Sequence, residues 1–253
     1  AGMTMSVYNL ISQYILIIGS IVALVFLAVA GNEKRAAAGL TRQNWKSAVL
    51  IVLAFVGIYI VRTVVSVAVQ GVSDGSGMQY VKEWAAMFKN PMMWLNIAAL
   101  PINYFFVFIA FFGEEYGWRY YLQPVLQKRF GLRAGVIILG VVWGLWHIPD
   151  DLFYYTQTSG IQMIFAQQIT CISLGIFFAY AYMKTQNIWV PVCLHYLNNN
   201  LIPIISGTFS ADVLENQTVS WKDLPVALVL NGLCFGFFRL ADVFKKKEVQ
   251  EEE

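Results

Sequence analysis

Long apolar runs joined by short polar links are the feature that most restricts how this chain can fold. Hydrophobic residues make up 58% of the 253 residues and charged residues only 13%, and the mean hydropathy is +0.59. A soluble domain carries about 45–50% apolar and about 25% charged residues. Apolar surface on this scale suits lipid rather than water as the solvent. We therefore predict an all-α fold, a polytopic transmembrane helical bundle.

Seven stretches approach the length of about 20 mostly apolar residues that a membrane-spanning helix needs. They are residues 7–30, 47–69, 92 to about 127, 134–149, 161–183, 188–206 and 224–243. The third is too long for one simple crossing and can tilt or continue along the membrane surface, so seven or eight helices are both compatible with it. The short links favour one integral membrane domain over residues 1–253.

Charges in the links between these stretches predict the orientation of the chain. The basic residues of the first and third links are Lys34, Arg35, Arg42, Lys46, Lys128, Arg129 and Arg133. The fourth link carries Asp150 and Asp151 instead. Because excess Lys and Arg stays on the cytoplasmic side, seven crossings predict an N-terminus outside and a C-terminus in the cytoplasm. The net charge of +2 gives no reason to expect a nucleic-acid partner.

Two adjacent carboxylates, Glu114 and Glu115, lie inside the third apolar stretch, followed one turn later by Arg119. Ionisable residues inside a span cost about 2.5–3.5 kcal/mol each on insertion scales and are functional suspects. Glu115 and Arg119 share a helix face at i,i+4, whereas Glu114 is rotated from Glu115 by about 100°. The pattern predicts one neutralised carboxylate and one that faces a cavity as a general acid or base. The alternative is an ion pair that only fixes helix packing.

The two histidines of the chain, His147 and His195, lie inside or at the end of apolar stretches. Trp143 precedes His147 by four residues, and Asn199 follows His195 at i,i+4, so each pair shares a helix face. A lone buried histidine is usually a packing residue. Two of them, near a charged helix in the same bundle, favour a shared polar site.

Other polar and small residues of the spans have structural interpretations. We expect Arg62 to reach the lipid headgroups with its long side chain. Amides that we interpret as interhelical hydrogen-bonding groups are Asn96, Asn103, Gln167, Gln168 and Asn231. Glycine pairs that predict close helix packing are Gly131/Gly135, Gly140/Gly144 and Gly232/Gly236.

Three polar motifs, taken in order, resemble the CPBP family of CAAX-protease and bacteriocin-processing membrane proteins, also called Abi proteins and related to type II CAAX prenyl endopeptidases. The family pattern is Glu-Glu-x-x-x-Arg, then aromatic-x-x-x-His, then His-x-x-x-Asn or Asp. The matching residues are Glu114-Glu115-x-x-x-Arg119, Trp143-x-x-x-His147 and His195-x-x-x-Asn199. The resemblance covers a catalytic core of about residues 99–206, with Trp143 where phenylalanine is commoner.

The resemblance implies an intramembrane endopeptidase in the bacterial cell membrane. Its expected partners are membrane lipids and a peptide or protein substrate, with lipidated proteins and leader peptides among the candidates. The expected catalytic residues are Glu114, Glu115, His147, His195 and Asn199, with Arg119 and Trp143 in supporting positions.

A water-based mechanism follows from these residue types. Glu114 and His147 would hold a water molecule and take its proton as it attacks the peptide carbonyl. His195 and Asn199 would donate hydrogen bonds to the developing oxyanion. Glu115 and Arg119 would fix the helix. No serine or cysteine has a suitably placed partner in the three motifs, so a covalent mechanism is not favoured.

Three alternatives remain open from the sequence. A zinc ion could bind to Glu114, His147 and His195, but His-Glu-x-x-His is absent and an asparagine amide is a poor zinc ligand, so we expect no cofactor. A non-enzymatic bacteriocin immunity or membrane partner-binding protein would use the polar cluster for packing. A transporter could use acids and histidines as a proton relay, but no inverted repeat is visible.

Overall fold

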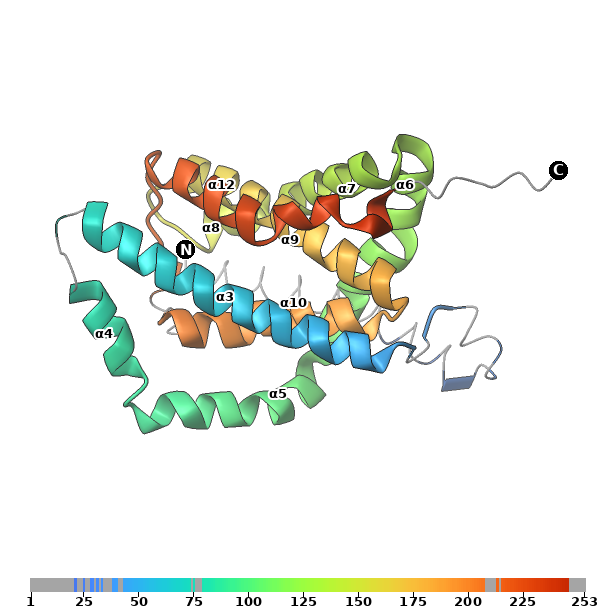
Figure 1. Cartoon of the computed structure of the whole chain (residues 1–253), viewed down its shortest axis with the longest axis horizontal. Helices are drawn as coiled ribbons and strands as arrows, with labels where there is room; N and C mark the ends of the chain where they lie inside the picture. The colour runs from blue at the N-terminus through green and yellow to red at the C-terminus, as the bar shows by residue number, and fades with distance from the viewer. Residues whose placement is uncertain are drawn as a thin grey trace.

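The computed structural model describes residues 43–73, 79–207 and 215–245, together with Gly75, Val213 and scattered positions between 21 and 40, and all of its regular elements are helices. The longer helices are α3 (Trp45–Ser73), α5 (Pro91–Glu115), α7 (Leu132–Trp146), α9 (Gly160–Thr185), α10 (Trp189–Ser206) and α12 (Asp223–Cys234), shown in Figure 1. Shorter α-helices are α4 (Gln79–Met87), α6 (Gln123–Phe130) and α8 (Ile148–Phe153). The predicted all-α membrane bundle is confirmed.

Four helical stretches are long and apolar enough to cross a membrane: Trp45–Val69, Pro91–Phe130, Leu132–Phe153 and Gly160–Thr185. They correspond to the second to fifth predicted spans. The sixth is α10, which His195 and three consecutive asparagines make less apolar. The first predicted span, 7–30, lies almost entirely outside the described residues.

Two sequence expectations about the ends of spans are wrong. The stretch 224–243 is not one helix, because α12 ends at Cys234 and two 3-10 segments follow it, η2 (Gly236–Leu240) and η3 (Asp242–Phe244). The break falls at Phe235, whose fully buried ring packs in the core. The fourth link is not a loop either, because Asp150 and Asp151 belong to α8, and the Asp151 side chain is fully buried.

Helix α10 lies at the centre of the bundle and packs against α5, α3 and α9. In Figure 1, α5 runs along one edge, α7 and α12 run along the opposite edge, and α3 and α10 lie between them. Helix α9 also packs against α7 and α12. The core where these helices meet is rich in aromatic and aliphatic side chains, including Phe55, Phe177, Phe178, Leu194 and Phe235. Because α10 contacts three neighbours, polar groups on its inner faces are close to several helices.

Close backbone contacts explain two of the three predicted glycine pairs. A Cβ at Gly140 would lie 2.6 Å from the Cα of Ile172 on α9, and one at Gly135 would lie 2.6 Å from the backbone nitrogen of Gln127. These glycines let α7 approach α9 and α6 closely. Gly232 has no such role, since a Cβ there would meet no atom of the described residues within 4 Å.

The third predicted stretch is one continuous helix, but its winding changes in the middle. Asn90 caps its start by accepting a hydrogen bond from the Met92 N–H at 3.0 Å, and Pro91 occupies the first turn. Directly after Glu115 the winding becomes a π-helix, η1 (Tyr116–Leu122), before α6 continues. A π segment widens the turn and is frequent at functional sites. Here it begins at the carboxylate pair.

Candidate active site

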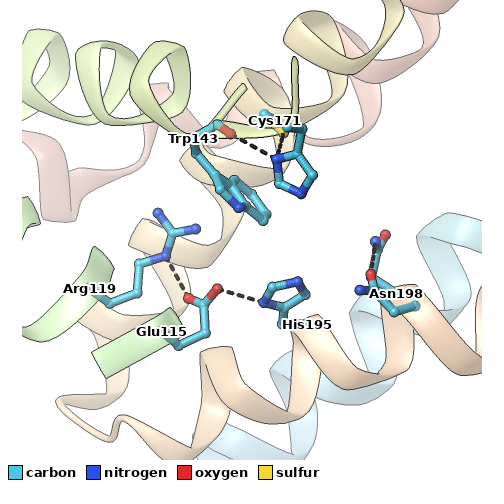
Figure 2. Close-up of polar contacts among 8 residues, drawn as sticks. Glu115, Arg119, Trp143, Cys171, His195 and Asn198 are labelled. Carbon is cyan, nitrogen blue, oxygen red and sulfur yellow. Dashed lines mark hydrogen bonds and ion pairs between the residues drawn. The ribbon is translucent and has the colours of Figure 1, made fainter. Parts of the chain in front are cut away.

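Deeply buried polar contacts join Glu115, Arg119 and His195, and we call these three residues the anchored half. Glu115 Oε2 accepts a hydrogen bond from Arg119 Nε at 2.8 Å, and Glu115 Oε1 lies 3.0 Å from His195 Nδ1 (Figure 2). Glu115 and Arg119 are both 0% exposed, and His195 is 3% exposed. The predicted Glu115–Arg119 pair is confirmed. The carboxylate also connects α5 to α10, which fixes Nδ1 of His195 on the side of Glu115.

Aromatic rings enclose the anchored half. Trp143 is central: its ring centroid lies 5.4 Å from that of His195 and 5.1 Å from the Arg119 guanidinium carbon. Phe111 lies edge-on to His195 with centroids 5.1 Å apart, and Phe178 contributes a second ring to the Arg119 guanidinium at 5.4 Å. The two terminal nitrogens of Arg119 have no hydrogen-bond partner among the described residues. The π faces of Trp143 and Phe178 therefore stabilise the guanidinium charge in place of hydrogen bonds.

Glu114 and His147 lie in a different environment, and we call them the open half. Both side chains are only half-buried. His147 Nδ1 donates to the Trp143 carbonyl at 2.8 Å, because a carbonyl oxygen only accepts, and this leaves the Nε2 lone pair available. Glu114 Oε2 is buried but has no hydrogen-bond partner in the part of the chain that the structure describes. A basic nitrogen and a carboxylate oxygen therefore both remain available for a proton.

Trp143 and the charge of Glu114 connect the two halves. The Trp143 ring centroid lies 5.8 Å from that of His147 as well as 5.4 Å from that of His195, so one ring touches both imidazoles. Glu114 is close enough to interact electrostatically with His195 and with Asp150, which also interacts with His147. Trp143 thus brings His147 and His195 together, and Glu114 lies within electrostatic range of His195.

Asn199 is the most accessible member of the predicted set and lies one turn beyond His195 on α10. Its Oδ1 accepts a hydrogen bond from Asn198 Nδ2 at 2.9 Å. Asn198 in turn accepts a hydrogen bond from the hydroxyl of Tyr59 on α3. Figure 2 shows His195 between Glu115 and Asn198, so the amides lie on the side of His195 away from the carboxylate.

A cysteine lies beside the open half, which sequence proximity did not indicate. Cys171 Sγ on α9 is 3.9 Å from His147 Nδ1 (Figure 2). That nitrogen carries a proton for the Trp143 carbonyl, so it cannot act as the base for the thiol. The Cys171 side chain is also 2% exposed. The geometry therefore gives no activated thiol, and Cys171 acts as a packing residue.

Further polar residues near the site were missed or misplaced by the sequence analysis. Asp151 is fully buried, and neither of its carboxylate oxygens has a hydrogen-bond partner among the described residues. Arg62 Nε donates to Asn231 on α12 at 2.9 Å, a contact that the sequence did not predict. The interpretation of Asn231, Asn103 and Gln168 as interhelical hydrogen-bonding groups is confirmed.

The proposed zinc ligands do not form a metal-binding group. Across residues 43–73, 79–207 and 215–245, no three His, Cys, Asp or Glu side chains are grouped closely enough to hold a metal ion. Nδ1 of each histidine is turned to a protein oxygen, Glu115 in one case and the Trp143 carbonyl in the other. Such contacts are also usual for a histidine that binds a metal through Nε2, so it is the separation of Glu114, His147 and His195, and not the Nδ1 contacts, that does not fit a three-ligand zinc site.

An apolar cavity of about 420 Å³ lies between α5 and α10, next to the aromatic wall of the anchored half. Its lining residues are Asn103, Phe106, Val107, Ile109, Ala110, Phe111 and Asn200. Phe111 lines this cavity and also contacts His195. The cavity therefore lies one ring away from the buried imidazole.

A family comparison matches the part of the chain that carries these residues. A family model described as type II CAAX prenyl endopeptidase Rce1-like matches residues 95–201, the segment that holds all three motifs. This central segment, which we call the family segment, is similar to the CPBP (CAAX protease) family. Both carboxylates and both histidines, with Arg119, Trp143 and Asn199, fall inside the family segment. Tyr59 lies outside it.

A similar curated protein is CAAX prenyl protease 2 from Methanococcus maripaludis. It is 27% identical over 125 residues, a match that covers 46% of this chain and 45% of that protein. The matched region is therefore less than half the length of the relative. No solved structure matches the chain. The resemblance to the CPBP family is confirmed.

Proposed function

We propose that the protein is an intramembrane endopeptidase that hydrolyses a peptide bond of a membrane-associated peptide or protein. The observation that carries this proposal is the junction of the three motifs: Glu115 contacts His195 at 3.0 Å, and Trp143 touches both histidine rings. Packing alone does not require an available carboxylate oxygen and an available imidazole nitrogen beside this junction. Buried polar atoms are normally satisfied by water or a ligand, which suits a site that holds a reacting water.

Glu114 and His147 activate the water. The Glu114 carboxylate and the Nε2 lone pair of His147 together hold the water, and Glu114 takes its proton as the water oxygen attacks the carbonyl carbon of the peptide. The proton then passes to the amide nitrogen as the C–N bond breaks, giving a carboxylic acid and an amine. Positioned general bases of this kind contribute about 10²–10⁴-fold. The two groups of the open half are the candidates because no other described residue uses their available atoms.

His195 and Asn199 stabilise the oxyanion. With Nδ1 held by Glu115, a protonated His195 presents Nε2–H on its opposite edge, and Asn199 presents its Nδ2 hydrogens one turn away. The negative charge of Glu115 favours the protonated ring, and Arg119 holds that carboxylate in place. A single preorganised donor of this kind contributes about 2.7–4 kcal/mol to the transition state.

The reaction we propose uses no metal ion. Glu114, His147 and His195 are not grouped as a ligand set among the described residues, and their available atoms support proton transfer and hydrogen bonding instead. Metal analysis of the purified protein tests this point. Stoichiometric zinc that is lost together with activity on chelation would overturn it.

A lipid-embedded or apolar segment is the substrate class that the surroundings favour. The apolar cavity beside Phe111 and the exposed rings of Phe105 and Phe106 form a hydrophobic surface along α5. A lipidated protein or the apolar part of a leader peptide could occupy such a surface while its peptide bond reaches His195.

Incubation of the purified protein in detergent with candidate leader peptides and with a prenylated peptide tests the function. We expect mass spectrometry to detect a defined cleavage product, absent from the matched Glu114→Gln protein. A product formed equally by the variant would reject the proposed base. If biological activity instead survives Glu114→Ala and His195→Ala in folded protein, a non-enzymatic immunity or binding role takes its place.

A further inference from the structure

A chain of side-chain hydrogen bonds reaches from α3 to the end of the proposed site. The Tyr59 hydroxyl donates to Asn198 Oδ1, and Asn198 Nδ2 donates to Asn199 Oδ1 at 2.9 Å. Tyr59 is 139 residues from Asn198 in the sequence and lies on a helix outside the family segment. Neither Tyr59 nor Asn198 belongs to the three motifs.

The donor-to-acceptor direction of these hydrogen bonds determines which end of the Asn199 amide remains available. An amide has an accepting oxygen and a donating nitrogen, and the two ends exchange when the group turns by 180°. Because Tyr59 donates to the oxygen of Asn198, the nitrogen of Asn198 is directed to the oxygen of Asn199. Asn199 Nδ2 accordingly keeps both hydrogens available, with no acceptor among the described residues.

Neighbouring side chains hold Tyr59, the first donor of the hydrogen-bond chain, in place. Tyr59 is 4% exposed, and its ring packs against Phe55 and Phe235 with centroids 4.9 Å away in each case. The guanidinium of Arg62 lies 5.7 Å from the same ring and donates to Asn231 of α12. A ring fixed by α3 and by the end of α12 gives its hydroxyl a defined position.

We propose that Tyr59 and Asn198 are positioning residues that hold Asn199 with its Nδ2 hydrogens directed toward the reacting carbonyl oxygen. This inference rests on the proposed function, in which Asn199 is an oxyanion donor. Without the two residues the Asn199 amide could turn and present an oxygen, which repels an oxyanion. The complete site therefore depends on a positioning side chain of α3, which lies outside the family segment.

Replacement of Tyr59 by phenylalanine tests the first step. It removes only the hydroxyl, so we expect kcat to fall about threefold to tenfold while KM stays unchanged, because a neutral hydrogen bond is lost only from the transition-state arrangement. Tyr196→Phe is the matched control, since it removes a buried hydroxyl on α10 that donates to the Leu100 carbonyl at 2.7 Å. Equal falls in kcat for both variants would overturn the proposal.

Asn198→Asp tests the direction of the chain. An aspartate accepts from Tyr59 but cannot donate to Asn199, so the Asn199 amide should turn its nitrogen toward residue 198. We expect kcat to fall as far as it does in Asn199→Ala, with thermal unfolding measured to confirm that each variant is folded. Adding Tyr59→Phe to Asn199→Ala should cause no further fall, because the oriented group is already absent.

The same variants separate failure of this inference from failure of the proposed function. If the wild-type protein cleaves no peptide, the function itself is rejected. If it cleaves and Asn199→Ala is slow, but Tyr59→Phe and Asn198→Asp match the wild type, only the positioning chain is wrong. A further fall on adding Tyr59→Phe to Asn199→Ala would also contradict it, because Tyr59 would then act elsewhere.

Discussion

Glu114 and Glu115 are adjacent in the sequence, yet they lie in opposite environments. Glu115 is fully buried between Arg119 and His195, whereas Glu114 is half-buried with an oxygen that has no partner among the described residues. The histidines differ in the same way, since His195 is 3% exposed beside a carboxylate and His147 is half-buried beside a carbonyl. The residues of the anchored half hold one another in place, whereas the residues of the open half have atoms available for proton exchange.

This contrast arises from helix geometry. A step of one residue rotates the side chain by about 100°, which is enough to take Glu114 out of the ion pair that fixes its neighbour. A buried ion pair contributes little net stability but is costly to break, because the remaining charge is left in a medium of low dielectric. The same substitution should therefore have different consequences at the two positions.

The largest effect on activity is expected for Glu114→Gln. The change keeps the shape of the side chain but removes the base, so we expect kcat to fall about 10²–10⁴-fold. Thermal unfolding should remain close to that of the wild type, because no hydrogen bond to a described residue is lost. A variant that unfolds much more easily than the wild type would show that Glu114 belongs to the anchored half instead.

The largest effect on stability is expected for Glu115→Gln, the same substitution one residue later. It leaves the buried Arg119 without a counter-charge, and breaking a buried pair costs about 3–5 kcal/mol. Unfolding monitored in detergent should show a loss of this size, accompanied by loss of activity. Glu114→Gln is the matched control, and equal stability of the two variants would remove the distinction between the halves.

A small effect is expected for Trp143→Phe. The ring that touches both histidines is retained in a smaller form, and the removed indole nitrogen has no hydrogen-bond partner among the described residues. We expect kcat to change less than about tenfold, whereas Trp143→Ala should lose about 3–5 kcal/mol of stability from the cavity it leaves. Severe loss of activity in the phenylalanine protein would mean that the indole has a role beyond packing.

Much of this arrangement could be predicted from residue spacing. Pairs at i,i+4 share a helix face, so the Glu115–Arg119 pair followed from the sequence alone. The rarity of ionisable groups in apolar helices directed attention to Glu114, His147 and His195. Long apolar stretches likewise predicted most of the helices, including the continuous one that carries the carboxylates.

Contacts between distant elements could not be predicted in this way. Nothing distinguishes Tyr59 from the other 12 of the 13 tyrosines until α3 is packed against α10. The π-helical winding after Glu115 and the break at Phe235 have no signal in hydropathy, because apolar residues continue through both. The sequence placed Asp151 in a link between spans, whereas it belongs to α8 and its side chain is completely buried.

The most direct test of the account compares Glu114→Gln, His147→Ala and the double variant in one peptide-cleavage assay. If Glu114 and His147 act together on a single water, each single substitution abolishes activation of that water. We then expect kcat of the double variant to be no lower than that of the slower single variant. Effects that multiply in the double variant would contradict it, because the two residues would then serve separate steps.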